Sequence, residues 1–362
     1  MKEGEEQGQH RTSSQSTSTV ASPSEFDFLR RLRQRTELAS QPSQTNQSVA
    51  VGLGDDAAVV RSTPGKETLI ATDMLVEDVD FRRTTVPAPL LGHKALAVSL
   101  SDIAAMGGRP RWSLISLGVP EDVWQSEFAN QFYEGLFHLA AQYNVQLIGG
   151  DTSRTPERIV IDSVVVGECP TDAAVKRSGA KQGDLICVTG SLGGSAAGLR
   201  LIERGAHLAD QSLGANETQA LDQLLLRHLR PEPRVGWGIV LGQEKLATAM
   251  IDISDGLSSD LNHLCVESNV GALIHSSSLP IDAQVQELCG RRALDPLQLA
   301  LHGGEDFELL FTVSPESLAK LPRRVDGVEI TKIGEVVDVS EGIKISEGSR
   351  VWDLAAGGWQ HF

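Results

Sequence analysis

The stretch VGLGDDAAVV, residues 51–60, places two adjacent carboxylates, Asp55 and Asp56, between glycines and an apolar run. Adjacent carboxylates repel each other unless they are solvated or bound to a cation. A solvated turn explains the stretch as well as a metal site does, because Asp and Gly are common in turns. The positions of the other acidic residues in the chain are needed to distinguish the two interpretations.

Further acids follow short apolar or β-branched runs: Asp73 after TLIAT, Asp151 after VQLIGG, and Asp252 with Asp255 in IDISDG. In open α/β sheets, ligand-binding groups collect at the carboxyl ends of the strands. One acid in that position is often only a helix N-cap, but several acids in the same setting indicate a shared site. We therefore expect them to converge.

Asp102 stands inside a predicted buried helix over residues 90–106. It lies in line with Leu91 and Val98 at spacings near the helical period. A carboxylate on a buried helix face costs several kcal/mol unless it is paired or bound to metal. The alternative to a metal ligand is a buried ion pair with Lys94 or with an arginine elsewhere.

These acids come without matching histidines or cysteines: no HExxH occurs, and no two of the four cysteines stand at CxxC spacing. Ligation by oxygen alone suits Mg²⁺, with Mn²⁺ and Ca²⁺ as alternatives. Mg²⁺ held by carboxylates and by substrate phosphates is typical of phosphoryl transfer. The acids therefore favour a magnesium and polyphosphate site.

Phosphate-binding candidates are weaker, because no GxxxxGK[ST] motif occurs. The loop GSLGGSAAG, residues 190–198, joins a predicted strand to a helix and could hold an anion with its backbone N–H groups. A plain strand–helix turn is the alternative. Arg177, in KRSGAKQGD, could clamp a phosphate, or it is a solvated loop charge.

Composition excludes several classes of partner. The chain has 32 Lys and Arg against 48 Asp and Glu, a net charge of −16, which argues against nucleic acid or an anionic membrane. No run of about 18 apolar residues predicts a transmembrane helix. The dispersed cysteines fit a reduced, cytoplasmic setting, and the polar residues 1–24 predict a disordered tail rather than a secretory signal.

A chain of 362 residues predicts two domains. Alternating strands and helices indicate an α/β or α+β architecture, with a change of unit near residues 167–170. The predicted units are a tail over 1–24, an N-terminal domain over 25–168 and a C-terminal domain over 169–362. Predicted strands are 68–72, 112–119, 145–148, 159–166, 184–189, 250–253 and 309–313; predicted helices are 26–35, 90–106, 123–143, 195–203, 216–229 and 257–267.

Together, these motifs resemble the thiamine-monophosphate kinase family, within the superfamily of aminoimidazole ribonucleotide synthetase. The matching stretches run in one order from about residue 51 to residue 362: GLGDDAAVV, ATDMLVEDVDF, KALAVSLSDIAAMGGRP, LIGGDTSR, RSGAKQGD, RHLRPEPR, IDISDGLSSDL, GGEDFEL and GGWQHF. The resemblance implies two α/β domains, the first binding metal and ATP and pairing its sheet across a homodimer. It also implies transfer of the γ-phosphoryl of ATP to thiamine monophosphate, with several Mg²⁺ ions.

The resemblance assigns roles residue by residue. The implied Mg²⁺ ligands are Asp56, Thr72, Asp73, Asp102, Asp151, Asp252 and Asp255, of which Asp102 and Asp151 are the expected catalytic residues. The implied nucleotide contacts are Gly150, Asp151, Arg177 and Ser254, and the implied substrate contacts are Asp80, Glu305 and Trp359. The family often has His where this chain has Asp80, so this contact departs from its pattern.

The Trp359 role also makes physical sense, because an aromatic face attracts a cation such as a thiazolium by about 0.5–2 kcal/mol; a packing plug is the alternative. Selenophosphate synthetases and hydrogenase-maturation carbamoyl dehydratases are disfavoured, because the first cysteine is Cys169 and the chain ends in GGWQHF. A Mg²⁺-dependent phosphate-ester hydrolase and a non-catalytic nucleotide-binding regulator remain alternatives.

Overall fold

The structure is a computed structural model that describes residues 25–39, 48–53, 57–210, 212, 215–291 and 294–359. The predicted tail over 1–24 and the carboxylates Asp55 and Asp56 lie outside these residues. The helices are α1 (Glu25–Ala39), α2 (Ala88–Ala105), α3 (Glu121–Trp124), α4 (Phe128–Tyr143), α5 (Gly194–Glu203), α6 (Ala215–Leu229), α7 (Val235–Gln243), α8 (Leu257–Ser268), α9 (Ala283–Arg291), α10 (Pro296–His302) and α11 (Pro315–Leu318), with the 3₁₀ turns η1 (Ser276–Ser278) and η2 (Val339–Glu341). The strands are β1 (Val49–Val51), β2 (Val59–Val60), β3 (Lys66–Val76), β4 (Arg109–Val119), β5 (Gln146–Arg154), β6 (Val160–Pro170), β7 (Leu185–Thr189), β8 (Ala247–Asp252), β9 (Gly271–His275), β10 (Leu309–Val313), β11 (Arg324–Val325), β12 (Val328–Val337), β13 (Ile343–Glu347) and β14 (Arg350–Asp353).

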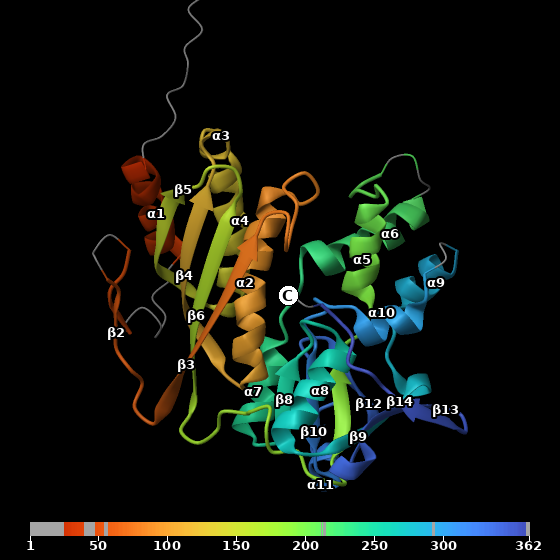
Figure 1. The fold of residues 1–362 in the computed structure, drawn as a ribbon. Coiled ribbons are helices and arrows are strands. Elements are labelled where there is room, and N and C mark those ends of the chain that lie inside the picture. The colour runs from red at the N-terminus through yellow and green to blue at the C-terminus, as the bar shows by residue number, and fades with distance from the viewer. Residues whose placement is uncertain are drawn as a thin grey trace, which may run out of the picture.

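The N-terminal unit is a four-stranded sheet in the order β3-β6-β4-β5, covered on one face by α2 and α4 (Figure 1). Only β4 and β5 are parallel. Along β3 the side chains alternate, so that Ile70 and Met74 are 72% and 61% exposed while Leu75 is buried. Strand residues alternate between faces, so one face of this sheet packs on helices and the other is open.

Helix α2 forms as predicted, over Ala88–Ala105, and is buried along almost its whole length. It packs unusually closely on α4: a Cβ added at Gly92 would lie 1.8 Å from the carbonyl oxygen of Phe132, and one at Gly135 would lie 1.8 Å from that of Pro89. On its other side, α7 contacts it through Gly238, whose added Cβ would lie 2.3 Å from the Ala104 oxygen. Glycine at these positions lets the helix backbones touch.

The C-terminal unit is an eight-stranded sheet in the order β14-β13-β9-β12-β7-β10-β8, with β11 paired to β12. It is antiparallel except for β9 and β13. Side chains along its strands alternate between two hydrophobic cores, one on each face of the sheet. Cys187 and Phe311 pack in the core that contains α2, whereas Ile186 and Leu310 pack in a second core with α8. One core therefore runs from the N-terminal sheet through α2 to the C-terminal sheet, and the predicted mixture of helices and sheets in two units is confirmed.

Several predicted boundaries were wrong. The helix predicted over 123–143 is divided into α3 and α4, and the strands predicted over 68–72 and 145–148 continue to Val76 and Arg154. Asp73 and Asp151 thus lie inside β3 and β5 rather than beyond their ends. Pairing with neighbouring strands, Asp73 opposite Ser163 and Asp151 opposite Ser116, overrides the weak strand preference of Asp and Gly.

Candidate active site

The predicted site residues of β3 lie on two faces of the N-terminal sheet. Asp73 shares the helix-covered face with Ser163, and Ser99 of α2 donates a hydrogen bond to the Ser163 carbonyl at 2.9 Å. Thr72, one residue earlier, lies on the open face, where its hydroxyl donates to Asp162 at 2.8 Å. The helix-covered face and the open face therefore carry separate polar groups.

The first group is an acidic cluster of Asp73, Asp102 and Asp252 at the junction of the two units. Ser101 of α2 donates to Asp252 Oδ2 of β8 at 2.7 Å, which ties the N-terminal helix to the C-terminal sheet. Burial raises the pKa of Asp102 to about 8, aided by the charges of Asp252 and Asp73 and opposed by Arg177. Burial likewise raises the pKa of Asp252 to about 6, against the hydrogen bond from Ser101. These carboxylates lie close enough to repel one another.

The donor chemistry of the cluster fits a hard cation. Burial raises the pKa of Asp73, and its Oδ2 atom is buried without a hydrogen-bond partner among the described residues. Within the described part of the chain, however, no three carboxylates, histidines or cysteines converge on one point as a ready metal site. A cation here needs further oxygen ligands, such as phosphate or water, as Mg²⁺ commonly has.

The second group lies on the open face of the sheet. Strand pairing places Asp162, Ser116 and Asp151 in one row, and Asp151 is exposed, with one carboxylate oxygen accepting a hydrogen bond from the Thr152 N–H at 2.8 Å. Asp162 was not among the predicted site residues, although it is the one acid in the strand sequence IVIDSVVV. The structure therefore brings Asp73, Asp102 and Asp252 together and places Thr72 and Asp151 apart from them.

Gly150 and Arg177, two predicted nucleotide contacts, lie in different segments of the chain. Gly150 lies opposite Ile115 in β5 with a φ of +144°, and an added Cβ would lie 2.0 Å from the Ile115 carbonyl oxygen. Arg177 is exposed and close enough to Asp102 and Asp252 to lower the pKa of both. An exposed guanidinium beside carboxylates is placed to meet an incoming phosphate.

The loop after β8, residues 253–256, connects the predicted nucleotide, metal and substrate residues. The Glu305 N–H donates to the Ser254 carbonyl at 2.7 Å, and the Trp359 N–H donates to the Asp255 carbonyl at 3.2 Å. From the other side, Asp260 accepts from the N–H groups of Asp255 and Gly256. Sequence reasoning missed Asp260, which the motif SDGLSSD places near the start of helix α8.

Glu305 is paired with two buried bases. Its Oε1 lies 2.7 Å from Lys94 Nζ, and its Oε2 lies 3.0 Å from His228 Nδ1. Burial would raise the pKa of Glu305, but the charges of Lys94 and His228 outweigh burial and lower it to about 2. Lys94 therefore pairs with Glu305, and not with Asp102 as one interpretation of the sequence allowed.

The other two predicted substrate residues lie in different surroundings. Asp80 Oδ2 accepts a hydrogen bond from the Val76 N–H at 2.8 Å, which closes the turn between these residues. Trp359 is 52% exposed, which does not fit a packing plug.

The glycine loop before α5 is occupied by a carboxylate of the protein itself. Asp306 accepts from the N–H groups of Gly193 and Ser195 at 2.7 and 3.1 Å. Nearby, the fully buried Glu308 accepts two hydrogen bonds from Arg234, at 2.5 and 2.6 Å. The loop therefore acts as a strand–helix turn whose N–H groups are taken by Asp306, which is one of the two alternatives that the sequence left open.

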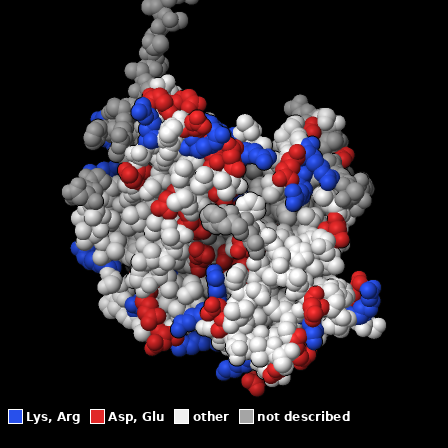
Figure 2. Space-filling view, viewed as in Figure 1, with Lys and Arg blue, Asp and Glu red and all other residues white. Residues whose placement is uncertain are grey.

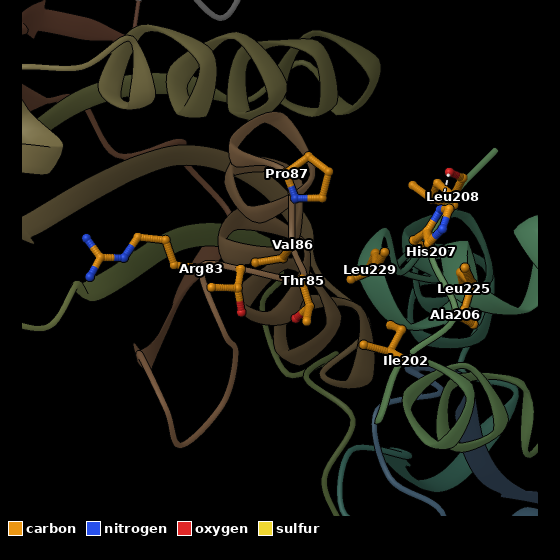
Figure 3. A pocket seen from close by; sticks show the side chains of 11 residues that line it. Arg83, Thr85, Val86, Pro87, Ile202, Ala206, His207, Leu208, Leu225 and Leu229 are labelled. Atoms are coloured by element: carbon orange, nitrogen blue, oxygen red, sulfur yellow. Dashed lines mark hydrogen bonds between the residues drawn. The ribbon is translucent and has the colours of Figure 1, made fainter. Parts of the chain in front are cut away.

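A cavity of about 350 Å³ lies between residues 83–87 and helices α5 and α6. Figure 3 shows Val86 and Pro87 on one side of it and Ile202, Leu225 and Leu229 on the other. Figure 2 shows acidic side chains at the middle of the face between the two units. The junction thus offers both an apolar cavity and an acidic hollow.

The family models of "AIR synthase related protein, N-terminal domain" and "AIR synthase related protein, C-terminal domain" match residues 54–169 and 181–345. The chain is 39% identical to the thiamine-monophosphate kinase of Bacillus subtilis (strain 168), over 93% of this chain and 99% of that one. It is 40% identical to that of Escherichia coli (strain K12), over 87% and 92%.

Solved structures of thiamine-monophosphate kinases superimpose on this chain over most of its length. The thiamine-monophosphate kinase of Stenotrophomonas maltophilia K279a superimposes with a TM-score of 0.77 at 36% identity, covering 88% of this chain and 96% of that one. The structure of AaThiL complexed with AMPPCP and TMP gives 0.71 at 34% identity, covering 93% and 97%. No helix among the described residues has the length and apolarity needed to span a membrane. On this likeness over nearly its whole length, the chain belongs to the thiamine-monophosphate kinase family.

Proposed function

We propose that the chain transfers the γ-phosphoryl group of ATP to the phosphate of thiamine monophosphate, giving thiamine diphosphate and ADP. The observation that carries this proposal is the 39% identity to a thiamine-monophosphate kinase over 93% of the chain. The AaThiL complex with AMPPCP, an ATP analogue, and TMP supports the choice of both substrates.

Several Mg²⁺ ions would be held by Asp73, Asp102 and Asp252 at the junction, with the remaining predicted ligands Asp56, Thr72, Asp151 and Asp255. The orphaned buried oxygen of Asp73 and the mutual repulsion of the cluster support this assignment. When bound, the ions would neutralise the phosphate charge during transfer. Asp102 and Asp151 are the ligands we assign to catalysis.

The chain's own side chains bind and orient the two anions. Arg177 meets phosphate charge at the rim of the cluster, and Gly150 and Ser254 contact the nucleotide. Glu305, kept ionised by Lys94, accepts a hydrogen bond from thiamine monophosphate or lies near its positive charge. The Trp359 ring stacks against the cationic thiazolium. Asp80 takes the third substrate contact, where the family often has His.

The attacking oxygen belongs to a phosphate that is already ionised at neutral pH. Direct in-line transfer therefore requires no strong general base and no covalent intermediate on the enzyme. The protein's contribution is to position the reacting groups and to compensate their charge.

We propose that the chain works as a cytoplasmic homodimer, with domains over residues 25–168 and 169–362. The exposed Ile70 and Met74 support a partner on the open face of the N-terminal sheet, because apolar sheet faces are usually covered. Thr72 and Asp151 belong to the same face, so a partner there would cover the second group of predicted ligands. Buried free cysteines, Cys169 among them, are compatible with a reducing compartment.

Product analysis tests the function. Purified protein is incubated with ATP, Mg²⁺ and thiamine monophosphate, and ADP, free phosphate and thiamine diphosphate are quantified. Equal amounts of ADP and thiamine diphosphate are expected. Free phosphate without thiamine diphosphate would identify a hydrolase, and nucleotide binding without any turnover would identify a regulator; either result overturns the proposal.

A further inference from the structure

The C-terminal segment is fastened to helix α8 by one buried serine. Ser258, 1% exposed, donates from Oγ to the Gly357 carbonyl at 2.7 Å and accepts from the Gly357 N–H at 3.1 Å. His302 Nδ1 lies 2.8 Å from the same oxygen. The Ser258 hydroxyl has a single proton, which it donates to the Gly357 carbonyl. In its contact with His302 the hydroxyl oxygen must therefore accept, and His302 Nδ1 carries the proton that is donated. The three groups form a closed set, which we call the Ser258 clasp.

The two glycines of the segment fit the clasp because they have no side chain. A Cβ added at Gly357 would lie 2.7 Å from His302 Nδ1. At Gly358 the φ is +152°, and an added Cβ would lie 2.4 Å from the Asp255 carbonyl oxygen. The close approach of both glycines brings the next residue, Trp359, onto the loop that follows β8.

Trp359 and Glu305 are therefore attached to consecutive carbonyls of one loop. The N–H of Glu305 bonds to Ser254, and the N–H of Trp359 bonds to Asp255. The clasp is the second attachment of the C-terminal segment, because its partners belong to α8 and to the end of α10. Losing the clasp would remove the two hydrogen bonds that hold Gly357, two residues before Trp359.

We propose that Ser258 and His302 are positioning residues for the phosphate acceptor: the Ser258 clasp holds the Trp359 ring where it meets the thiamine part of the substrate. This inference rests on the proposed kinase function. Neither residue needs to touch the substrate. Their effect is transmitted through Gly357 and Gly358 to the indole, so losing the clasp should weaken acceptor binding rather than nucleotide binding.

Steady-state kinetics of Ser258→Ala, Trp359→Ala and the double variant test the proposal. We expect Ser258→Ala to raise the KM for thiamine monophosphate about five- to tenfold, the effect of losing roughly one net hydrogen bond. The KM for ATP should change less than twofold. Because Ser258 acts through Trp359, the double variant should behave like Trp359→Ala alone. The matched control is Ser259→Ala, the neighbouring serine, whose hydroxyl has no hydrogen bond among the described residues and which should match the wild type.

Independent, additive effects of the two substitutions, or an equal rise in both KM values, would overturn the proposal. If Ser258→Ala does not fold, Gly358→Ala makes the same test at the exposed end of the segment and should raise the same KM. Failure of the kinase function is a separate result, because the wild-type protein would then form no thiamine diphosphate. If the wild type forms thiamine diphosphate but the effects of Ser258→Ala and Trp359→Ala are additive, the clasp proposal is rejected and the kinase function stands.

Discussion

Replacing Glu305 by glutamine should lower the free energy of unfolding by about 3 kcal/mol, because the change leaves the Lys94 ammonium buried without its counter-charge. Lys94 is only 2% exposed, and Glu305 is its one ion-pair partner among the residues that the structure describes. The reverse change, Lys94→Met, should cost less. Glu305 is 28% exposed and keeps His228 at 3.0 Å, so its charge retains both water and a donor.

The magnitude follows from the pKa of Glu305. A pKa of about 2, against an ordinary 4.5, corresponds to roughly 3.5 kcal/mol at about 1.4 kcal/mol for each pH unit, and partial exposure brings this toward about 3 kcal/mol. The sign is that of a lowered carboxyl pKa: the stabilisation is complete above pH 4.5 and is lost as the pH falls toward 2. The difference between wild type and Glu305→Gln should therefore be constant from pH 6 to 8 and shrink in acid.

Urea denaturation of the wild type, both single variants and the double variant measures these terms. The double variant should be more stable than Glu305→Gln, because neither charge remains to be buried alone. The reasoning is refuted if Glu305→Gln unfolds within about 0.5 kcal/mol of the wild type, or if Lys94→Met proves the more damaging change.

Asp102→Asn should lower turnover by orders of magnitude yet stabilise the metal-free fold, increasingly so as the pH rises from about 4 to 8. The reason is that burial, aided by the charges of Asp252 and Asp73, raises the wild-type pKa to about 8. Near-normal turnover, or a less stable variant in chelator at about pH 8, contradicts this. Arg234→Met should lower the unfolding free energy by about 2–3 kcal/mol, since the fully buried Glu308 loses its bidentate partner but keeps Arg227 and Thr189. A loss below about 1 kcal/mol in urea denaturation argues otherwise. Gly150→Ala should weaken ATP binding in calorimetry, because its Cβ meets the Ile115 oxygen, whereas the control Gly149→Ala meets only the movable end of Leu114; equal affinity in both variants rejects the assignment.

The parts of the fold that sequence predicted are those specified by local pattern. Helix α2 is apolar all round and therefore buried, and the run before Val166 is a strand because it is rich in β-branched residues. Helix α7, VGWGIVLGQ, was not predicted from the sequence, and its three glycines have low helix propensity. Gly238 packs closely against Ala104 of α2, and Gly242 against Gly107 just beyond that helix, contacts that only the tertiary structure reveals.

The candidate site was predictable in composition but not in geometry. The acidic residues stand out in the sequence, yet the division between Asp73 and Thr72 depends on the face that each strand position presents. The pairing of Lys94 with Glu305 and the filling of the glycine loop by Asp306 join residues far apart in the chain. No local pattern encodes such contacts, so alternatives for them stayed open until the fold was known.

Helix α2 packs the two units of the molecule around one shared core, so we expect them to unfold together. Its side chains belong to the core that also includes the inner faces of both sheets, and Ser101 fastens it to β8 (Figure 1). Partial unfolding of either domain would expose this helix and remove packing from the other. The slowest amide exchange should therefore lie in α2, and neither half is built to persist as an independent fragment.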